Sequence, residues 1–237
     1  MNEENLGLPS QSLPDGLWVV IVAYNEQLRI GAVLDDLLEV VKNVVAVDDG
    51  SCDDTAGEVL KRPVWLVRHA VNLGQGASLQ TGISFALERH AEYIVTFDAD
   101  GQHCTADIPM LLERLVAAGA DFALGSRFLG KAQNIPWGRK LMLRMAVVFT
   151  RIFSGVALTD AHNGLRAMTR RGALHVHLTM NRMEHASQII DQIARCGLKY
   201  VEAPVTIRYT ADSLAKGQRT SAALRLGVKI LLEKMIR

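Results

Sequence analysis

Four short apolar runs, each closed by a polar cluster, constrain the fold of this sequence more than any other feature. The runs cover residues 17–24, 43–48, 93–98 and 120–128, and the clusters at their ends read YNE, DDGS, DAD and GSR. A continuous apolar run of this length is typical of a parallel strand that is covered on both faces. The chain is therefore expected to build a parallel sheet whose strands end in polar side chains.

Segments with helical spacing separate these strands. Ile30, Val33, Leu34 and Leu37 recur at the spacing of one helix face, and Val64 begins a further short strand. Because strands and helices alternate, the sequence predicts an α/β fold, a Rossmann-like, doubly wound and mostly parallel sheet with helices on both faces. The expected helices in this part of the chain cover residues 25–42, 53–62, 77–89 and 106–118.

The sequence changes character at Trp137, where a cationic stretch begins. We expect the second half of the chain to pack on one edge of the sheet and to cover a cleft, within the same domain. The expected elements there are a helix over 139–153, a helix over 184–197, a strand over 199–209 and a last helix over 222–236. The predicted organisation is a flexible N-terminus (1–16), one domain (17–220) and a C-terminal amphipathic helix (221–237).

Composition excludes several classes of protein. The 237 residues carry a formal net charge of +1, which gives no argument for nucleic acid as a partner. Three cysteines without a CxxC spacing argue against a disulfide framework or a zinc site and favour a reducing compartment. No apolar run reaches about 18 residues, so no membrane-spanning helix is expected. We predict a cytoplasmic protein, with peripheral contact to the inner face of the membrane left open.

The polar clusters predict a ligand site at one rim of the sheet, because open α/β sheets bind ligands beyond the C-terminal ends of their strands. Asp98 and Asp100 are the central pair. Two carboxylates at this spacing suit Mg²⁺ or Mn²⁺, and such a cation would bridge a diphosphate and stabilise it as a leaving group. Gln102 could add an oxygen ligand. His103 is more typical of a hydrogen-bonding neighbour than of a metal ligand.

Two other interpretations of the same residues come from different classes of protein. An Asp-x-Asp-Gly sequence after a buried strand also occurs in haloacid-dehalogenase-like phosphatases, but there it follows the first strand of the core. A nucleotide-sugar-binding subunit without turnover is the other alternative. The dinucleotide fingerprint is missing from the first strand–helix turn, and the glycine-rich stretch 72–82 lacks the Gly-Lys-Ser/Thr ending of a phosphate loop. Gly74 and Gly76 therefore suggest a tight turn and close helix–sheet packing.

Taken together, these segments resemble the family 2 glycosyltransferases with the GT-A fold, and most of all the branch that transfers sugars to dolichyl and polyprenyl phosphates. The resemblance extends from Leu17 to about Arg219. It is carried by the order and spacing of VAYNE (22–26), VDDGSCDDT (47–55), NLGQGASLQTG (72–82), FDADGQH (97–103), LGSRF (124–128), NGLRAMTRR (163–171), VEAPVTIRY (201–209) and KGQR (216–219).

This resemblance implies roles for individual residues. The strand-end residues that it assigns to the nucleotide base and ribose are Ala23, Tyr24, Glu26 and Asp49, with Asp49 as acceptor for a base N–H group. It assigns Asp98, Asp100 and Gln102 to the metal, Asp98 also to the nucleotide sugar, and Asp100 to catalysis as well. It places Arg127 near a donor or acceptor phosphate, and Arg208 and Lys216 on a segment that closes over the diphosphate.

The acceptor is the harder half of the prediction. A sugar hydroxyl needs a general base, whereas a lipid phosphate is already anionic. Glu184 is the candidate base, with Asp160 and Asp191 as competitors, and the alternative is that Glu184 stabilises the start of its helix electrostatically. We expect an inverting transfer from a nucleoside-diphosphate sugar to a polyprenyl phosphate, or else to a hydroxyl of a lipid-linked glycan. Contact with a membrane or a membrane protein, and a homo-oligomer, are left open.

Overall fold

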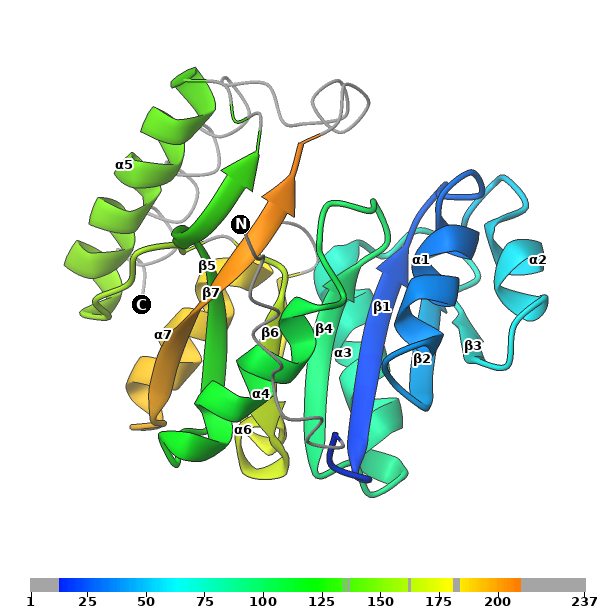
Figure 1. Ribbon diagram of the computed structural model, residues 1–237, viewed down its shortest axis with the longest axis horizontal. Helices are drawn as coiled ribbons and strands as arrows, with labels where there is room; N and C mark the ends of the chain where they lie inside the picture. Colours follow the sequence, from blue (N-terminus) through cyan, green and yellow to red (C-terminus); the bar gives the residue numbers. More distant parts are fainter. Residues whose placement is uncertain (1–12, 134, 136, 162, 181–183, 210–237) are drawn as a thin grey trace, which may run out of the picture.

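The protein forms one seven-stranded mixed sheet with helices on both faces (Figure 1). The computed structural model describes residues 13–133, 135, 137–161, 163–180 and 184–209. Lys216, the loop that carries it and the predicted C-terminal helix lie outside these residues, as does most of the predicted flexible N-terminus. The strand order is β3-β2-β1-β4-β6-β5-β7.

The first half of the sheet is parallel, as expected. Each strand here is a short apolar run, and β1 pairs with β2 on one side and with β4 on the other. The strands are β1 (Leu17–Ala23), β2 (Asn43–Asp48), β3 (Trp65–Arg68) and β4 (Tyr93–Asp98), and the helices between them are α1 (Ile30–Leu38), α2 (Thr55–Leu60) and α3 (Gln75–Glu88). The three strand ends that carry polar clusters in this half, those of β1, β2 and β4, therefore meet at one rim.

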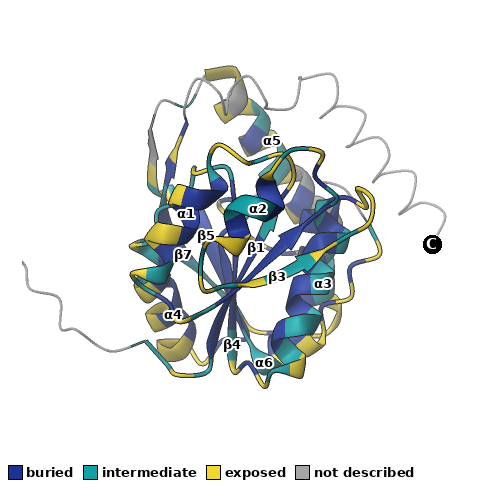
Figure 2. Ribbon diagram, turned by 90° about the vertical axis from the view of Figure 1, so that its right-hand side faces the viewer, coloured by how far each residue is buried: buried dark blue, intermediate teal, exposed yellow. Residues whose placement is uncertain are grey.

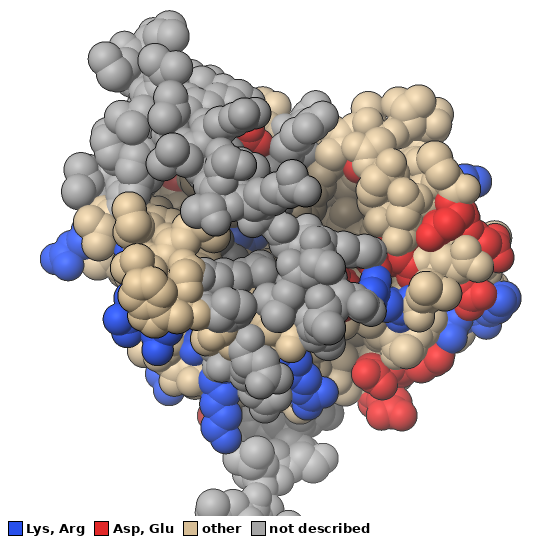
Figure 3. All heavy atoms as spheres, turned by 90° about the horizontal axis from the view of Figure 1, so that it is seen from above, with Lys and Arg blue, Asp and Glu red and all other residues tan. Residues whose placement is uncertain are grey.

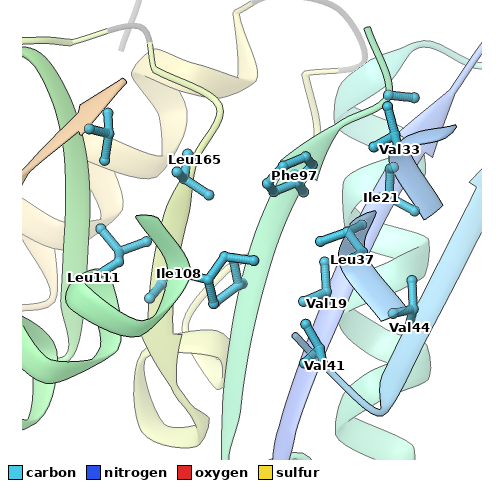
Figure 4. Packing of buried hydrophobic residues seen from close by; sticks show 14 of the residues in the cluster. Val19, Ile21, Val33, Leu37, Val41, Val44, Phe97, Ile108, Leu111 and Leu165 are labelled. Carbon is cyan, nitrogen blue, oxygen red and sulfur yellow. The ribbon is translucent and has the colours of Figure 1, made fainter. Parts of the chain in front are cut away.

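Both faces of the central strands are buried, which explains why β1, β2 and β4 are apolar over most of their length. Alternate residues of β1 point to opposite faces, so that Val19 and Ile21 belong to one core cluster and Trp18 and Val20 to the other. The first cluster packs under α1, α2 and α4 (Asp107–Ala117), and Figure 4 shows its central side chains. The second packs under α3, α6 (Arg170–Leu174) and α7 (His185–Arg195). In Figure 2 the sheet accordingly forms a buried layer between helices whose outer sides are exposed.

The second half of the chain adds two strands to the sheet, of which the sequence predicted one, over 199–209. β6 (Arg166–Thr169) runs antiparallel between β4 and β5 (Phe122–Gln133), and β7 (Tyr200–Arg208) is the edge strand, parallel to β5. Neither β6 nor α6 was predicted. Because β6 is antiparallel to its neighbours, its first residue lies at the rim where β4 and β5 deliver their polar ends.

Helix α5 (Trp137–Ser154) lies at the end of the molecule away from β3 (Figure 1). It packs against α7, and the Ser154 hydroxyl at its end donates a hydrogen bond to Asp191 of α7. No helix in the described part of the chain is long and apolar enough to cross a membrane. The three cysteines are free.

Candidate active site

The loops that follow β1 and β2 are joined by hydrogen bonds at the rim. The backbone N–H of Asn25 donates to Ser51 Oγ at 2.9 Å, and the backbone N–H of Cys52 donates to Asn25 Oδ1 at 2.9 Å. Glu26 N–H donates to Thr55 Oγ1 at 2.9 Å. Asn25 has a positive φ of 54°, a conformation that Asn tolerates better than most residues. The first two sequence clusters therefore form one surface, beside which the side chain of Tyr24 is exposed.

Asp49 is buried beneath this surface and holds the turn that precedes α3. Its Oδ1 accepts a hydrogen bond from Leu73 N–H at 3.0 Å, and its Oδ2 accepts one from Gly74 N–H at 2.8 Å. His69 Nδ1 lies 2.8 Å from the same Oδ1 atom. Gly74 has φ +100°, which confirms the tight turn expected at this glycine. These contacts give Asp49 a structural function, while its contact with a nucleotide base stays a prediction.

Asp98 ends β4 and is surrounded by groups that stabilise its negative charge. Gln75 Nε2, in the first turn of α3, donates to Asp98 Oδ1 at 3.0 Å, and His103 Nε2 lies 3.1 Å from Asp98 Oδ2. A Cβ atom on Gly164 would lie 2.1 Å from Asp98 Oδ2, so only glycine fits there without displacing the carboxylate. Burial acts to raise the pKa of Asp98, but the hydrogen bond from His103 and the charge of Arg166 bring this pKa below its ordinary value.

Asp100 lies in the turn after β4, and its environment shifts its pKa in the opposite direction from that of Asp98. The backbone N–H of Gln102 donates to Asp100 Oδ1 at 3.0 Å, and the side-chain amide of Gln102 donates to Oδ2. Burial and the nearby negative charge of Asp98 raise the pKa of Asp100. Asp98, Asp100 and Gln102 are thus brought together as predicted, and His103 is a hydrogen-bonding neighbour.

These residues fit a divalent cation that completes its coordination with a substrate. Among the described residues no three His, Cys, Asp or Glu side chains are arranged as a metal cage. Mg²⁺ is usually held by one or two carboxylates together with substrate phosphates, so a complete protein cage is not required. Asp98 and Asp100 supply two carboxylates whose mutual repulsion a cation would relieve. The amide oxygen of Gln102 is the third candidate donor.

Arg166 is a charged residue of the site that sequence reasoning did not single out. It is the first residue of β6, pairs in register with Thr96 of β4, and is buried. Burial lowers the pKa of its guanidinium, and the charges of Asp98 and Asp160 act against that shift. Its Nη1 atom has no hydrogen-bond partner among the described residues. The signal was present in the sequence, because an Arg inside NGLRAM interrupts an otherwise apolar stretch.

Arg127 lies within β5 and not in a loop at its end. It is buried, and its Nε donates to Asp160 Oδ2 at 2.6 Å, while its Nη1 donates to the Tyr209 hydroxyl. Burial acts to lower the pKa of the guanidinium, but Asp160 and Tyr209 raise this pKa above its ordinary value. The observed contacts make Arg127 part of an internal ion pair. Its contact with a phosphate stays a prediction.

Glu184 occupies the N-cap position of α7 and is buried. Its side chain makes no capping hydrogen bond, so a stabilising effect on α7 would be electrostatic. The two competing carboxylates are engaged elsewhere, since Asp160 accepts from Arg127 and Asp191 accepts from Ser154. His185, beside Glu184, is also buried and acts electrostatically on Asp98. Glu184 therefore precedes the residue of α7 that acts on Asp98, and its role as a base stays a prediction.

The end of β7 is attached to the acidic loop after β4. Arg208 N–H donates to the carbonyl oxygen of Gln102 at 2.9 Å, and His103 forms an isolated antiparallel bridge with Ile207. The side chain of Arg208 is exposed beside this loop. Strand β7 therefore ends beside the loop that carries Asp100, and Lys216 follows eight residues after Arg208 in the sequence.

A family model described as Glycosyl transferase family 2 matches residues 18–176, which include the β1 and β2 loops, the Asp98–Asp100 pair and β6. The chain belongs to glycosyltransferase family 2. It is 32% identical over 222 residues to a polyprenol monophosphomannose synthase of Mycolicibacterium smegmatis, covering 87% of this chain and 82% of the relative. It is 28% identical over 242 residues to a UDP-N-acetylglucosamine–dolichyl-phosphate N-acetylglucosaminyltransferase of Methanococcus voltae, covering 92% of this chain and 96% of the relative.

Solved structures confirm the GT-A fold of this family 2 glycosyltransferase. Glucosyl-3-phosphoglycerate synthase from Mycobacterium tuberculosis, in complex with uridine diphosphate, superposes with a TM-score of 0.69 at 18% identity, over 91% of this chain and 77% of the other. The same enzyme in complex with Mn²⁺ and UDP-glucose gives a TM-score of 0.69 at 18% identity, over 91% of this chain and 76% of the other. The alternative of a haloacid-dehalogenase-like phosphatase does not agree with this membership.

Proposed function

We propose that this glycosyltransferase moves a sugar from a nucleoside-diphosphate sugar to a polyprenyl phosphate, with inversion at the anomeric carbon. The observation that carries the proposal is the acidic pair Asp98 and Asp100 at the sheet rim, in a chain similar over most of its length to enzymes that act on lipid phosphates. An undecaprenyl-phosphate mannosyltransferase of Micrococcus luteus, 31% identical over 201 residues with 79% of this chain and 81% of the relative covered, supports the same acceptor class.

Asp98, Asp100 and Gln102 would hold Mg²⁺ or Mn²⁺ in this proposal. When bound, the cation supplies positive charge that stabilises the diphosphate as it leaves. Gln75 and His103 keep the Asp98 carboxylate in place, and their hydrogen bonds favour its ionised form. The protein's own contribution at this position is thus a fixed pair of acceptor carboxylates that does not have to reorganise when the donor arrives.

The donor would lie along the joined β1 and β2 loops. Ala23, Tyr24 and Glu26 line the end of β1, and the exposed ring of Tyr24 is suited to contact a base. Asp49 holds the neighbouring turn, and we keep its N–H acceptor function as part of the proposal. Exposed Arg208 offers a bidentate cation for the diphosphate, and Lys216 is proposed to add a second positive charge.

A polyprenyl phosphate acceptor agrees with the burial of Glu184. A phosphate oxygen is a nucleophile without help, whereas a sugar hydroxyl must hand its proton to a base that contacts it. The attacking phosphate oxygen would form the new bond to the anomeric carbon as the bond to the nucleoside diphosphate breaks on the opposite side. Arg127 and Asp100 are the other residues to which we assign catalytic effects, through an acceptor phosphate and the diphosphate respectively.

The decisive experiment measures transfer from labelled nucleotide sugars to undecaprenyl phosphate, with and without Mn²⁺, and identifies the anomer of the product. A panel of donors in a thermal-shift assay selects the nucleotide first, because a ligand of the native state raises its stability. The proposal is supported if a lipid-phosphate product forms only when the cation is present and if that product has the inverted anomeric configuration. Donor binding without product would identify a binding subunit instead.

Two variants separate the proposed roles in this assay. Asp100→Ala should abolish transfer and weaken metal-dependent donor binding, and unchanged kinetics would remove the metal assignment. Glu184→Gln should retain transfer to a polyprenyl phosphate. Loss of transfer to undecaprenyl phosphate in a Glu184→Gln variant that unfolds at the wild-type temperature would show that Glu184 is needed even for an anionic acceptor, and would contradict the assignment.

A further inference from the structure

Among the described residues, helix α5 has an inner face that packs on the protein and an outer face that is exposed. Leu143 and Thr150 are buried on the inner side. The outer side carries large apolar residues with exposed fractions of 78% at Trp137, 47% at Leu141, 63% at Met145 and 58% at Val148. At 3.6 residues per turn these four positions fall within an arc of roughly 80° around the helix axis. They form one continuous stripe rather than scattered exposed side chains, and such a stripe indicates a binding surface.

A row of positive charge runs along one side of this stripe. Lys140, Arg144 and Arg151 are exposed and occupy the neighbouring arc of roughly 40°. The sequence of α5 contains no Asp or Glu. Figure 3 shows basic side chains on the side of the molecule where α5 lies and a group of acidic side chains at the opposite end. The outer face of α5 is thus apolar and cationic at once, in a chain whose net charge is only +1.

We propose that this α5 face, made of Trp137, Leu141, Met145 and Val148 with Lys140, Arg144 and Arg151, binds the surface of an anionic lipid bilayer. Interfacial helices combine an apolar stripe, aromatic residues and flanking Lys or Arg in this way. The helix would lie in the plane of the bilayer, with its stripe among the acyl chains and its cations at the headgroups. Each cation near an anionic surface adds to the attraction.

Charge complementarity favours a bilayer over a second copy of the chain. An isologous contact through this face would bring two rows of Lys and Arg together, and like charges at an interface oppose association. An anionic membrane neutralises the row instead. The inference stands on α5 alone and does not rest on the proposed acceptor, although a polyprenyl phosphate would be presented in the same bilayer.

The test is co-sedimentation of the full-length protein with vesicles of phosphatidylcholine alone or of phosphatidylcholine with phosphatidylglycerol. We expect binding to the anionic vesicles that is at least tenfold tighter and that weakens as salt is raised. Met145→Glu should weaken binding to anionic vesicles at least tenfold. Leu174→Glu is the matched control, because Leu174 of α6 is similarly exposed at 53% and lies outside α5, and it should bind as the wild type does.

A second readout reports the position of α5 directly. The emission of Trp137 should shift to shorter wavelength on addition of anionic vesicles, and Trp137→Phe should remove that shift. Equal vesicle binding by wild type and Met145→Glu would overturn the proposal. So would a Met145→Glu variant that changes only the sedimentation coefficient, which would identify a second copy as the occupant, or only the unfolding temperature, which would identify residues 210–237 of this chain.

The experiment also separates this inference from the proposed function. Transfer to a short, water-soluble prenyl phosphate needs no bilayer, so Met145→Glu should catalyse it at the wild-type rate. Vesicle binding without transfer to any lipid phosphate would contradict the proposed function and leave the α5 face intact. Transfer without vesicle binding would contradict the α5 face and leave the proposed function intact.

Discussion

Substitution of Asp160 by Asn tests the internal ion pair that supports the rim of the sheet. Asp160 Oδ2 accepts from Arg127 Nε at 2.6 Å and from Arg127 N–H at 3.1 Å. The exposed fractions are 3% for Asp160 and 7% for Arg127. Water therefore cannot solvate the Arg127 guanidinium when the negative charge of Asp160 is removed. Asn keeps the shape of the side chain, and its amide oxygen can still accept one of these hydrogen bonds. The main effect is the loss of the negative charge that faces the buried guanidinium of Arg127.

Removal of one partner from a buried ion pair costs about 3–5 kcal/mol. The total stability of a domain is about 5–15 kcal/mol, so Asp160→Asn should remove a large part of it. With a urea dependence of about 3 kcal/mol per molar, the midpoint of unfolding should fall by about 1–1.7 M. Equilibrium urea unfolding followed by circular dichroism measures this shift.

The matched control is Asp36→Asn in α1, where the carboxylate is exposed and the expected change is within about 0.5 kcal/mol. The double variant Asp160→Asn with Arg127→Met removes both charges of the pair. It should be less destabilised than the sum of the two single variants, because the buried positive charge is removed together with the carboxylate that it faces. A loss below about 1 kcal/mol in Asp160→Asn would refute the reasoning, since it would mean that the pair is not desolvated.

Three further predictions use contacts at other places in the fold. Gly76→Ala should destabilise the protein by about 1–3 kcal/mol, because the added Cβ would lie 2.0 Å from the carbonyl oxygen of Met180. Ala is normally the better helix residue, so a raised unfolding temperature would contradict this prediction. Gly164→Ala should slow transfer at least tenfold by displacing the Asp98 carboxylate, and an unchanged transfer rate would show that Asp98 does not have to be in place. Burial raises the pKa of Asp107, so the wild type should lose stability relative to Asp107→Asn as the pH rises from below 3.8 to 7. Urea unfolding of both proteins at the two ends of that range measures the difference in stability. A difference that stays constant would exclude the raised pKa.

The parallel half of the fold could be predicted because its strands are buried on both faces. Such strands are continuous apolar runs, and β1, β2 and β4 were predicted within one residue of their observed ends. Strand β6 was missed because four residues, beginning with Arg166, give no periodicity that distinguishes a strand from a loop. Helix α1 begins at Ile30 rather than near Asn25, because residues 24–29 form the hydrogen-bonded loop to β2.

The candidate site was predictable where residues follow one another in the sequence and not where the sheet brings them together. Asp98, Asp100 and Gln102 come from one short stretch, and their grouping needed no knowledge of the fold. Gln75 and Arg166 approach Asp98 from α3 and from β6. Their positions depend on the strand order β1-β4-β6-β5, which no local pattern specifies.

The attachment of β7 to the loop after β4 connects the end of the last described strand to the loop that carries the acidic pair. The backbone hydrogen bond from Arg208 to Gln102 and the bridge between Ile207 and His103 hold the two segments together. The two residues that hold the end of β7, Gln102 and His103, follow Asp100 by two and three positions. Displacement of the end of β7 would therefore be transmitted to the carboxylate loop as well as to β5, its partner in the sheet.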